Sequence, residues 1–106
     1  MRKIRVFVSL PEGETYKKIY NKAIKPLVKG NLEIICYEDR PITSDPFENA
    51  IRKLIAFSNL VIGILIGNNR NVLYEIGMAL AYGKPVLIIT DFPENLEAMV
   101  KKAAMQ

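Results

Sequence analysis

The sequence contains no histidine and no tryptophan, and it has a single cysteine, Cys36. Without histidine, triads built on an imidazole base are excluded, and zinc and haem sites lose their usual ligands. One cysteine cannot form a disulfide within the chain, and Cys36 lies in an apolar run that predicts a small buried side chain. Any acid–base chemistry must therefore come from carboxylates, tyrosine, lysine or cysteine. We expect neither a metal nor a cofactor.

The sequence also lacks the patterns of membrane spans, signal peptides and common nucleotide-binding motifs. No apolar run approaches the roughly 20 residues needed to span a bilayer, and the first residues do not resemble a signal peptide. We therefore expect a cytoplasmic protein with no membrane contact. Neither a Walker A pattern nor a G-x-G-x-x-G fingerprint occurs, which disfavours ATP hydrolysis and standard dinucleotide oxidoreduction.

The composition is that of an ordinary globular protein, with 50% hydrophobic and 25% charged residues. A length of 106 residues predicts one domain, spanning 1–106. The net charge is +4, and a cluster of lysines from Lys17 to Lys29 falls on one predicted helix. The cluster has no interleaved aromatic residues and no nucleic-acid motif, so it indicates a solvated helix face rather than a nucleic-acid surface.

Strands and helices alternate along the chain. We predict strands at 4–9, 32–37, 60–66 and 86–90, and helices at 14–28, 46–58, 72–83 and 94–104. Pro26 should kink or end the first helix. The strands at 60–66 and 86–90 are apolar throughout, which is typical of strands covered on both faces. The order predicts an α/β fold with a three-layer, doubly wound parallel sheet of the flavodoxin-like or Rossmann-like type, in strand order 2-1-3-4.

One stretch, Gly67–Pro85, combines an asparagine-rich loop with a helix that is apolar on nearly every side. Such a helix is normally buried, yet Glu75 places a carboxylate within it, which is costly without a partner. If Asn71 caps this helix, Glu75 is its fourth residue and lies past the capping-box position. Glu75 therefore has either a functional role or a structural one, such as an ion pair with Arg70, Arg40 or another subunit.

The predicted topology places this stretch at a ligand-binding position. In doubly wound sheets, ligands bind beyond the carboxyl ends of the strands where the winding reverses, here between the first and third strands. The loops at 9–13 and 67–71 meet there. A helix N-terminus with glycine and asparagine beside it can hold phosphate or sugar hydroxyl groups.

The segments Asn59–Ile62, Gly67–Ala79 and Gly83–Val86 resemble the core of the nucleoside 2-deoxyribosyltransferase-like superfamily, a pattern shared with nucleotide-binding, TIR-like proteins. The resemblance follows the order of elements along most of the chain and is specific from Ala56 to Ile89. It implies a nucleoside or nucleotide ligand and supports a homo-oligomer. In the transferases, the glutamate that matches Glu75 attacks the anomeric carbon of the sugar and displaces the base. In active TIR enzymes, the matching glutamate serves cleavage of the nicotinamide–ribose bond of NAD.

Together these arguments assign Glu75 as the catalytic residue. The predicted substrate-binding residues are Ser9, Leu10, Gly13, Asp39, Arg40, Gly67, Asn68, Asn69 and Asn71.

Three functions stay open. The first is N-glycosidic bond cleavage or base exchange, as a hydrolase or transferase. The second is a non-catalytic nucleotide-binding or TIR-like sensing module, which is favoured because Ile64 and Asn69 stand where the transferases usually carry aspartates. The third is a structural or assembly protein that retains the fold, with Glu75 in an intersubunit ion pair.

Overall fold

The structure, a computed structural model, describes residues 3–35, 47–67 and 69–91. Its elements in chain order are β1 (Ile4–Ser9), α1 (Glu14–Ile19), η1 (Tyr20–Ile24), η2 (Lys25–Leu27), β2 (Leu32–Ile35), α2 (Phe47–Phe57), β3 (Leu60–Leu65), α3 (Arg70–Ala81) and β4 (Val86–Thr90). The predicted alternation is confirmed for these residues. The predicted helix at 94–104 and the segment 36–46, which contains Cys36, lie outside the described residues.

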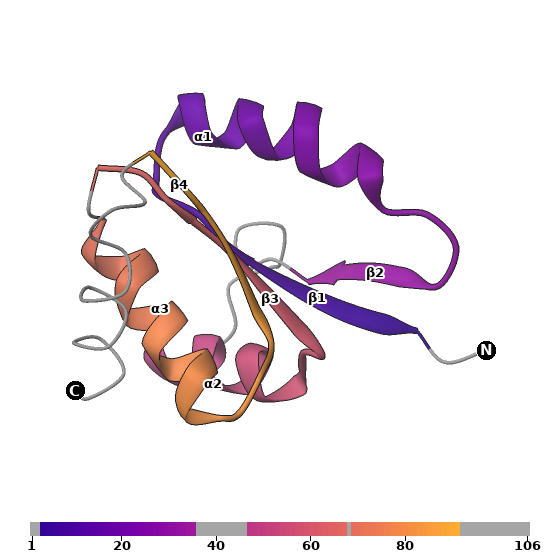
Figure 1. The fold of residues 1–106 in the computed structure, drawn as a ribbon, viewed down its shortest axis with the longest axis vertical. Coiled ribbons are helices and arrows are strands. Elements are labelled where there is room, and N and C mark those ends of the chain that lie inside the picture. The colour runs from indigo at the N-terminus through magenta and orange to yellow at the C-terminus, as the bar shows by residue number, and fades with distance from the viewer. Residues whose placement is uncertain (1–2, 36–46, 68, 92–106) are drawn as a thin grey trace.

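The four strands form one parallel sheet in the order β2-β1-β3-β4, as predicted from the sequence. Helices cover both faces, with α1 on one side and α2 and α3 on the other (Figure 1). Because all strands run in the same direction, their carboxyl ends meet at the end of the sheet where α1 and α3 begin (Figure 1). The winding reverses between β1 and β3, which pair with Ser9 opposite Gly63.

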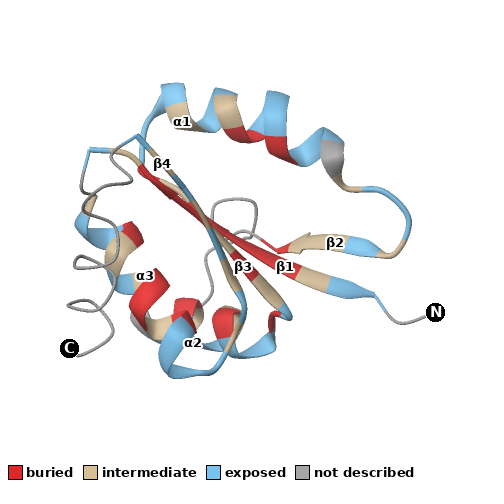
Figure 2. Ribbon diagram, viewed as in Figure 1, coloured by how far each residue is buried: buried red, intermediate tan, exposed pale blue. Residues whose placement is uncertain are grey.

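The face under α1 has its own apolar core. Strand residues Val6, Val8 and Ile64 pack there against Tyr20 and Ile24 of η1. Successive side chains of a strand point to opposite faces, so alternate residues of β1 supply this cluster. Figure 2 colours buried residues red on β1, on β3 and on the helices that pack against them.

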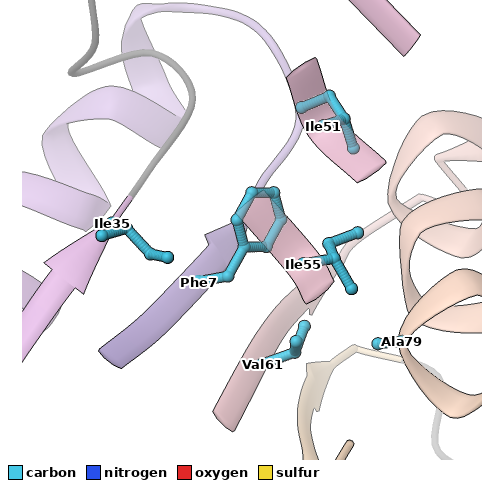
Figure 3. Packing of buried hydrophobic residues seen from close by; sticks show 6 residues of the cluster. All are labelled: Phe7, Ile35, Ile51, Ile55, Val61 and Ala79. Carbon is cyan, nitrogen blue, oxygen red and sulfur yellow. The ribbon is translucent and has the colours of Figure 1, made fainter. Parts of the chain in front are cut away.

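The opposite face is packed by α2 and α3. Phe7 and Val61 of the sheet contact Ile51 and Ile55 of α2 in a cluster that also includes Ala79 of α3 (Figure 3). A neighbouring cluster joins Leu65 of β3 to Val72 and Ile76 of α3. These contacts fix α3 against the sheet beside the point where the winding reverses.

The first helix is irregular near Pro26, as predicted. The α-helix ends at Ile19, continues as a π-helical segment and a 3₁₀ turn, and stops at Leu27. Proline has no N–H to donate, and its ring clashes with the carbonyl of the preceding turn, so regular α-helical bonding cannot continue through it. The five lysines between Lys17 and Lys29 are exposed, and four of them lie on the helical segments while Lys29 follows η2.

At the amino end of the sheet, Arg5 fastens β1 to the connection between α2 and β3. Its Nε donates to the carbonyl of Phe57 at 2.6 Å, and its guanidinium lies 4.0 Å from the centre of the Phe57 ring. Its backbone N–H donates to Oδ1 of Asn59 at 2.9 Å. This cation therefore has an identifiable structural role at the end of the sheet opposite to the Glu75 loop.

Strand β4 is covered on one face only, so the expectation that both faces of the strand at 86–90 are covered was wrong. Val86 and Ile88 pack beside α3, whereas Leu87 is 53% exposed and Ile89 is 46% exposed. The reason is position, since β4 is the last strand of the described sheet and only its α3 side is packed. A wholly apolar strand does not reveal this difference, because neither of its faces carries a polar marker.

Helix α3 is likewise less buried than its composition suggested. One side packs into the core through Val72, Ile76 and Ala79, while Tyr74 and Leu80 are exposed. The helix ends at Ala81, two residues before the predicted end at 83. Gly83 has a φ of 71°, its N–H bonds to the carbonyl of Leu80, and the N–H of Lys84 bonds to the carbonyl of Ala79. This pairing is a Schellman motif, which explains the glycine structurally.

In the described part of the chain, no helix has both the length and the apolar character that a membrane crossing demands. The cytoplasmic location and the domain span of 1–106 stay predictions.

Helix α3 approaches β3 closely because Gly63 has no side chain. A Cβ atom at this position would lie 2.7 Å from Cδ1 and 2.8 Å from Cγ1 of Ile76. Both distances are shorter than real Cβ contacts, so a larger residue would push α3 away from the sheet.

We predict that Gly63→Ala lowers the free energy of unfolding by about 1–3 kcal/mol through overpacking. Urea denaturation measures this change. The matched control is a double-mutant cycle with Ile76→Ala, which removes both atoms that the new methyl group would meet. The double variant should be more stable than the sum of the two single changes predicts, and strictly additive losses would contradict the close contact.

Candidate functional site

Ser9 and Glu75 form the centre of the candidate site. Ser9 is the last residue of β1, and its side chain lies on the same face as Phe7, towards α3. Its hydroxyl donates to Oε1 of Glu75 at 2.7 Å, across 66 positions of sequence. Ser9 is 1% exposed, whereas Glu75 is half-buried. The carboxylate therefore lies at the switch point between β1 and β3, where the topology predicted a site.

The Ser9–Glu75 contact depends on the close approach of α3. Ser9 and Gly63 are opposite each other in the β1–β3 register, and Gly63 faces Ile76. Ile76 directly follows Glu75 on α3, so the gap at Gly63 also sets the distance between the carboxylate and the strands. Sequence reasoning missed Gly63 as a site determinant, although a lone glycine inside an apolar strand is a known sign of close backbone approach.

The hydrogen bond between Ser9 and Glu75 has a clear electrostatic effect. A hydroxyl that donates to an ionised carboxylate makes a stronger bond than a neutral pair does. Partial burial strengthens the interaction because less water competes for the carboxylate. A carboxylate held in this way is suited to nucleophilic attack or to binding hydroxyl groups of a sugar.

The loop before α3 differs from the prediction in one respect. The N-cap is Asn69, whose Oδ1 accepts from the N–H of Val72 at 3.0 Å, and Asn71 lies exposed in the first turn. The predicted cap at Asn71 was therefore wrong by two residues. Gly67, with a φ of 66°, follows the end of β3, and the helix begins at Arg70. Glu75 is consequently the sixth helical residue. It lies beyond the first turn, and the first turn is where the helix dipole has most effect.

The other predicted binding residues lie at several places. Leu10 is half-buried and packs on the face under α1, away from the Ser9 hydroxyl. Gly13 is exposed before α1, with a φ of 126°, and Gly67 is exposed after β3. The structure thus brings Ser9 and Glu75 together and leaves Leu10 on the other side of the sheet. Three more predicted binding residues lie outside the described residues, namely Asp39, Arg40 and Asn68.

The structure also shows where Ile64 lies, at the position where the transferases usually carry an aspartate. Its side chain is 2% exposed and belongs to the apolar cluster under α1. The second such position, Asn69, uses its side-chain oxygen to cap α3. Neither residue supplies a carboxylate near Glu75. Over residues 3–35, 47–67 and 69–91, no group of three or more histidine, cysteine, aspartate or glutamate residues is arranged to hold a metal ion.

Comparison with known proteins assigns no family to this arrangement. No protein-family model matches the chain, and no curated protein matches it significantly. The resemblance carried by Gly67–Ala79 and its flanking segments therefore stays a prediction.

We predict that Asn69→Ala lowers the free energy of unfolding by about 1 kcal/mol, because it removes the side-chain acceptor that caps α3. Thermal or urea denaturation measures the loss. Asn71→Ala is the matched control, since Asn71 lies exposed two residues further along and should change stability by less than about 0.5 kcal/mol. Equal losses in the two variants would contradict the assignment of Asn69 as the cap.

Proposed function

We propose that the protein cleaves or exchanges an N-glycosidic bond of a nucleoside or nucleotide, with Glu75 as the nucleophile. The observation that carries this proposal is the half-buried Glu75 carboxylate, held by Ser9 at 2.7 Å at the switch point of the sheet. Ligands of doubly wound sheets bind at this position. The resemblance of Gly67–Ala79 to the transferase-like superfamily suggests the substrate class.

The proposed reaction has two steps, in which Glu75 is consumed and then restored. The carboxylate forms a C–O bond to the anomeric carbon while the C–N bond breaks and the departing base keeps the electron pair. The base of a deoxynucleoside takes a proton from water, whereas nicotinamide leaves the pyridinium form of NAD as a neutral molecule and needs none. A water molecule or a second base then attacks the same carbon, loses a proton and releases the carboxylate. This scheme needs no histidine, and a retaining glycosidase uses a carboxylate in the same role.

Residues around the carboxylate would bind the rest of the substrate. Gly67 lies in the loop before α3 and Asn71 lies in its first turn, where backbone N–H groups and the positive end of the helix dipole favour phosphate or sugar oxygens. Asn69 already uses its side-chain oxygen as the cap of α3, so any contact of Asn69 with a ligand would come from its other polar atoms.

The alternative function is a non-catalytic nucleotide-binding or TIR-like sensing module. It is favoured by Ile64, which is buried in the apolar cluster under α1 where the transferases usually carry an aspartate. A site with Glu75 but without that aspartate could retain binding and lose the handling of the base. A purely structural role draws support from the same hydrogen bond, because Ser9 already satisfies part of the Glu75 carboxylate.

We predict that the protein releases free base from deoxynucleosides, or nicotinamide from NAD, and that Glu75→Gln lowers this rate by about 10³-fold or more, as loss of a nucleophile does. Chromatography of the released base, with and without a second base present, measures the reaction. Glu33→Gln is the control, because Glu33 lies in β2. In the sheet, β1 separates β2 from β3.

Two results would overturn the catalytic proposal: no turnover of any substrate by the unaltered protein, or equal rates for Glu75→Gln and the unaltered protein. Absence of turnover together with ligand-induced stabilisation would favour the binding module. A ligand at 100 times its dissociation constant should then raise stability by about 2.7 kcal/mol.

A homo-oligomer is the proposed assembly, with β4 as the contact between two copies. The strand Val86–Thr90 carries no charged residue, and Leu87 and Ile89 are exposed. Charges normally protect an edge strand from pairing. Two copies of β4 related by a two-fold axis at Ile88 would pair antiparallel, with Leu87 of each copy opposite Ile89 of the other.

We predict that the protein sediments as a dimer at micromolar concentration and that Leu87→Glu sediments as a monomer, because the added charges repel across the proposed axis. Analytical ultracentrifugation distinguishes these states. Leu80→Glu is the matched control, since Leu80 is 38% exposed on α3 and its substitution should leave the dimer intact. A monomeric unaltered protein, or identical behaviour of the two variants, would contradict this interface.

A further inference from the structure

Ser9 is buried too deeply to be explained well as a substrate-binding residue. It is 1% exposed, and the proton of its hydroxyl is directed at Oε1 of Glu75. A hydroxyl has only one proton to donate, so a donor engaged by the carboxylate is not also available as a donor to a substrate. Its action on a ligand would therefore pass through Glu75.

We propose that Ser9 is a positioning residue that holds the Glu75 carboxylate in the orientation needed for attack, with Gly63 setting the distance. This inference rests on the proposed function and deepens it. The carboxylate sits at the end of a rotatable side chain, and a hydrogen bond from a rigid strand restricts that rotation. Ser9 is itself fixed, because it is buried and paired in register with β3.

Gly63 completes the arrangement from the neighbouring strand. It lies opposite Ser9 in the register, and its missing side chain leaves room for Ile76, the residue after Glu75. The same register pair thus supplies the donor at Ser9 and the space at Gly63. A carboxylate displaced by about 1 Å from its productive position can lose about 10² in rate, so these two small residues control reactivity without touching the substrate.

The chain contains a matched control for the loss of a buried serine hydroxyl. Ser58 is 0% exposed, and its hydroxyl donates to the carbonyl of Ile55 at 2.7 Å at the end of α2. Ser9→Ala and Ser58→Ala each remove one buried hydroxyl and one hydrogen bond of the same length. A merely structural role for Ser9 predicts the same consequences for both variants.

The first experiment measures turnover. Ser9→Ala should lower kcat by about 10²-fold with little change in KM, because the bound substrate remains but the nucleophile is poorly aimed. Ser9→Thr, which keeps the hydroxyl, should recover most of the rate, and Ser58→Ala should retain the unaltered kcat. Equal effects of Ser9→Ala and Ser58→Ala on kcat, or a change confined to KM, would overturn the inference.

The second experiment does not depend on turnover, so it separates failure of this inference from failure of the proposed function. NMR order parameters of the Glu75 side chain report its motion on the picosecond to nanosecond timescale. They should fall in Ser9→Ala and stay unchanged in Ser58→Ala. If the unaltered protein shows no turnover but this difference appears, the positioning role stands and the reaction is wrong. Unchanged order parameters in Ser9→Ala would overturn the positioning role itself.

Discussion

The close packing of α3 on β3 is the constraint on which both the core and the candidate site depend. A Cβ atom at Gly63 would lie 2.7 Å from Ile76, so the helix could not occupy its position over a larger residue. The apolar contacts of Val72 and Ile76 hold the helix there, and the same closeness brings Glu75 to the hydroxyl of Ser9. Stability and the proposed reactivity therefore share one determinant, and a substitution that loosens the helix should weaken both.

The local chemistry then follows from what surrounds the carboxylate. Glu75 is half-buried and accepts a hydrogen bond from the hydroxyl of Ser9. An ionised, oriented carboxylate can attack a sugar carbon without histidine, in agreement with a sequence that contains none. The buried Ile64 favours the binding module instead, because it adds no carboxylate to assist the departing base of the proposed reaction. These two residues define the choice between an enzyme and a binding module.

Most of the fold was predictable from the sequence, because the strands, the helices and the breaks between them each have a recognisable residue pattern. Alternating strand and helix patterns predicted the parallel order, and Pro26 marked the end of the first helical segment. The cap of α3 was misplaced because the sequence of the loop contains three asparagines, each chemically able to cap, and only the structure shows that Asn69 does so. The exposure of Leu87 was missed because an all-apolar strand has no polar side to identify.

The position of Ser9 and Glu75 at this end of the sheet was predictable, but the hydrogen bond between them was not. Topology put the ends of β1 and β3 beside the start of α3, whereas the hydrogen bond from Ser9 depends on side-chain direction and helix distance. The most direct test of the account is acid quenching of the reaction with a deoxynucleoside or NAD during turnover, followed by tandem mass spectrometry of the peptides. The account predicts a sugar adduct on Glu75 that has lost the base. Base release with no adduct on Glu75, or with an adduct on another residue, would contradict it.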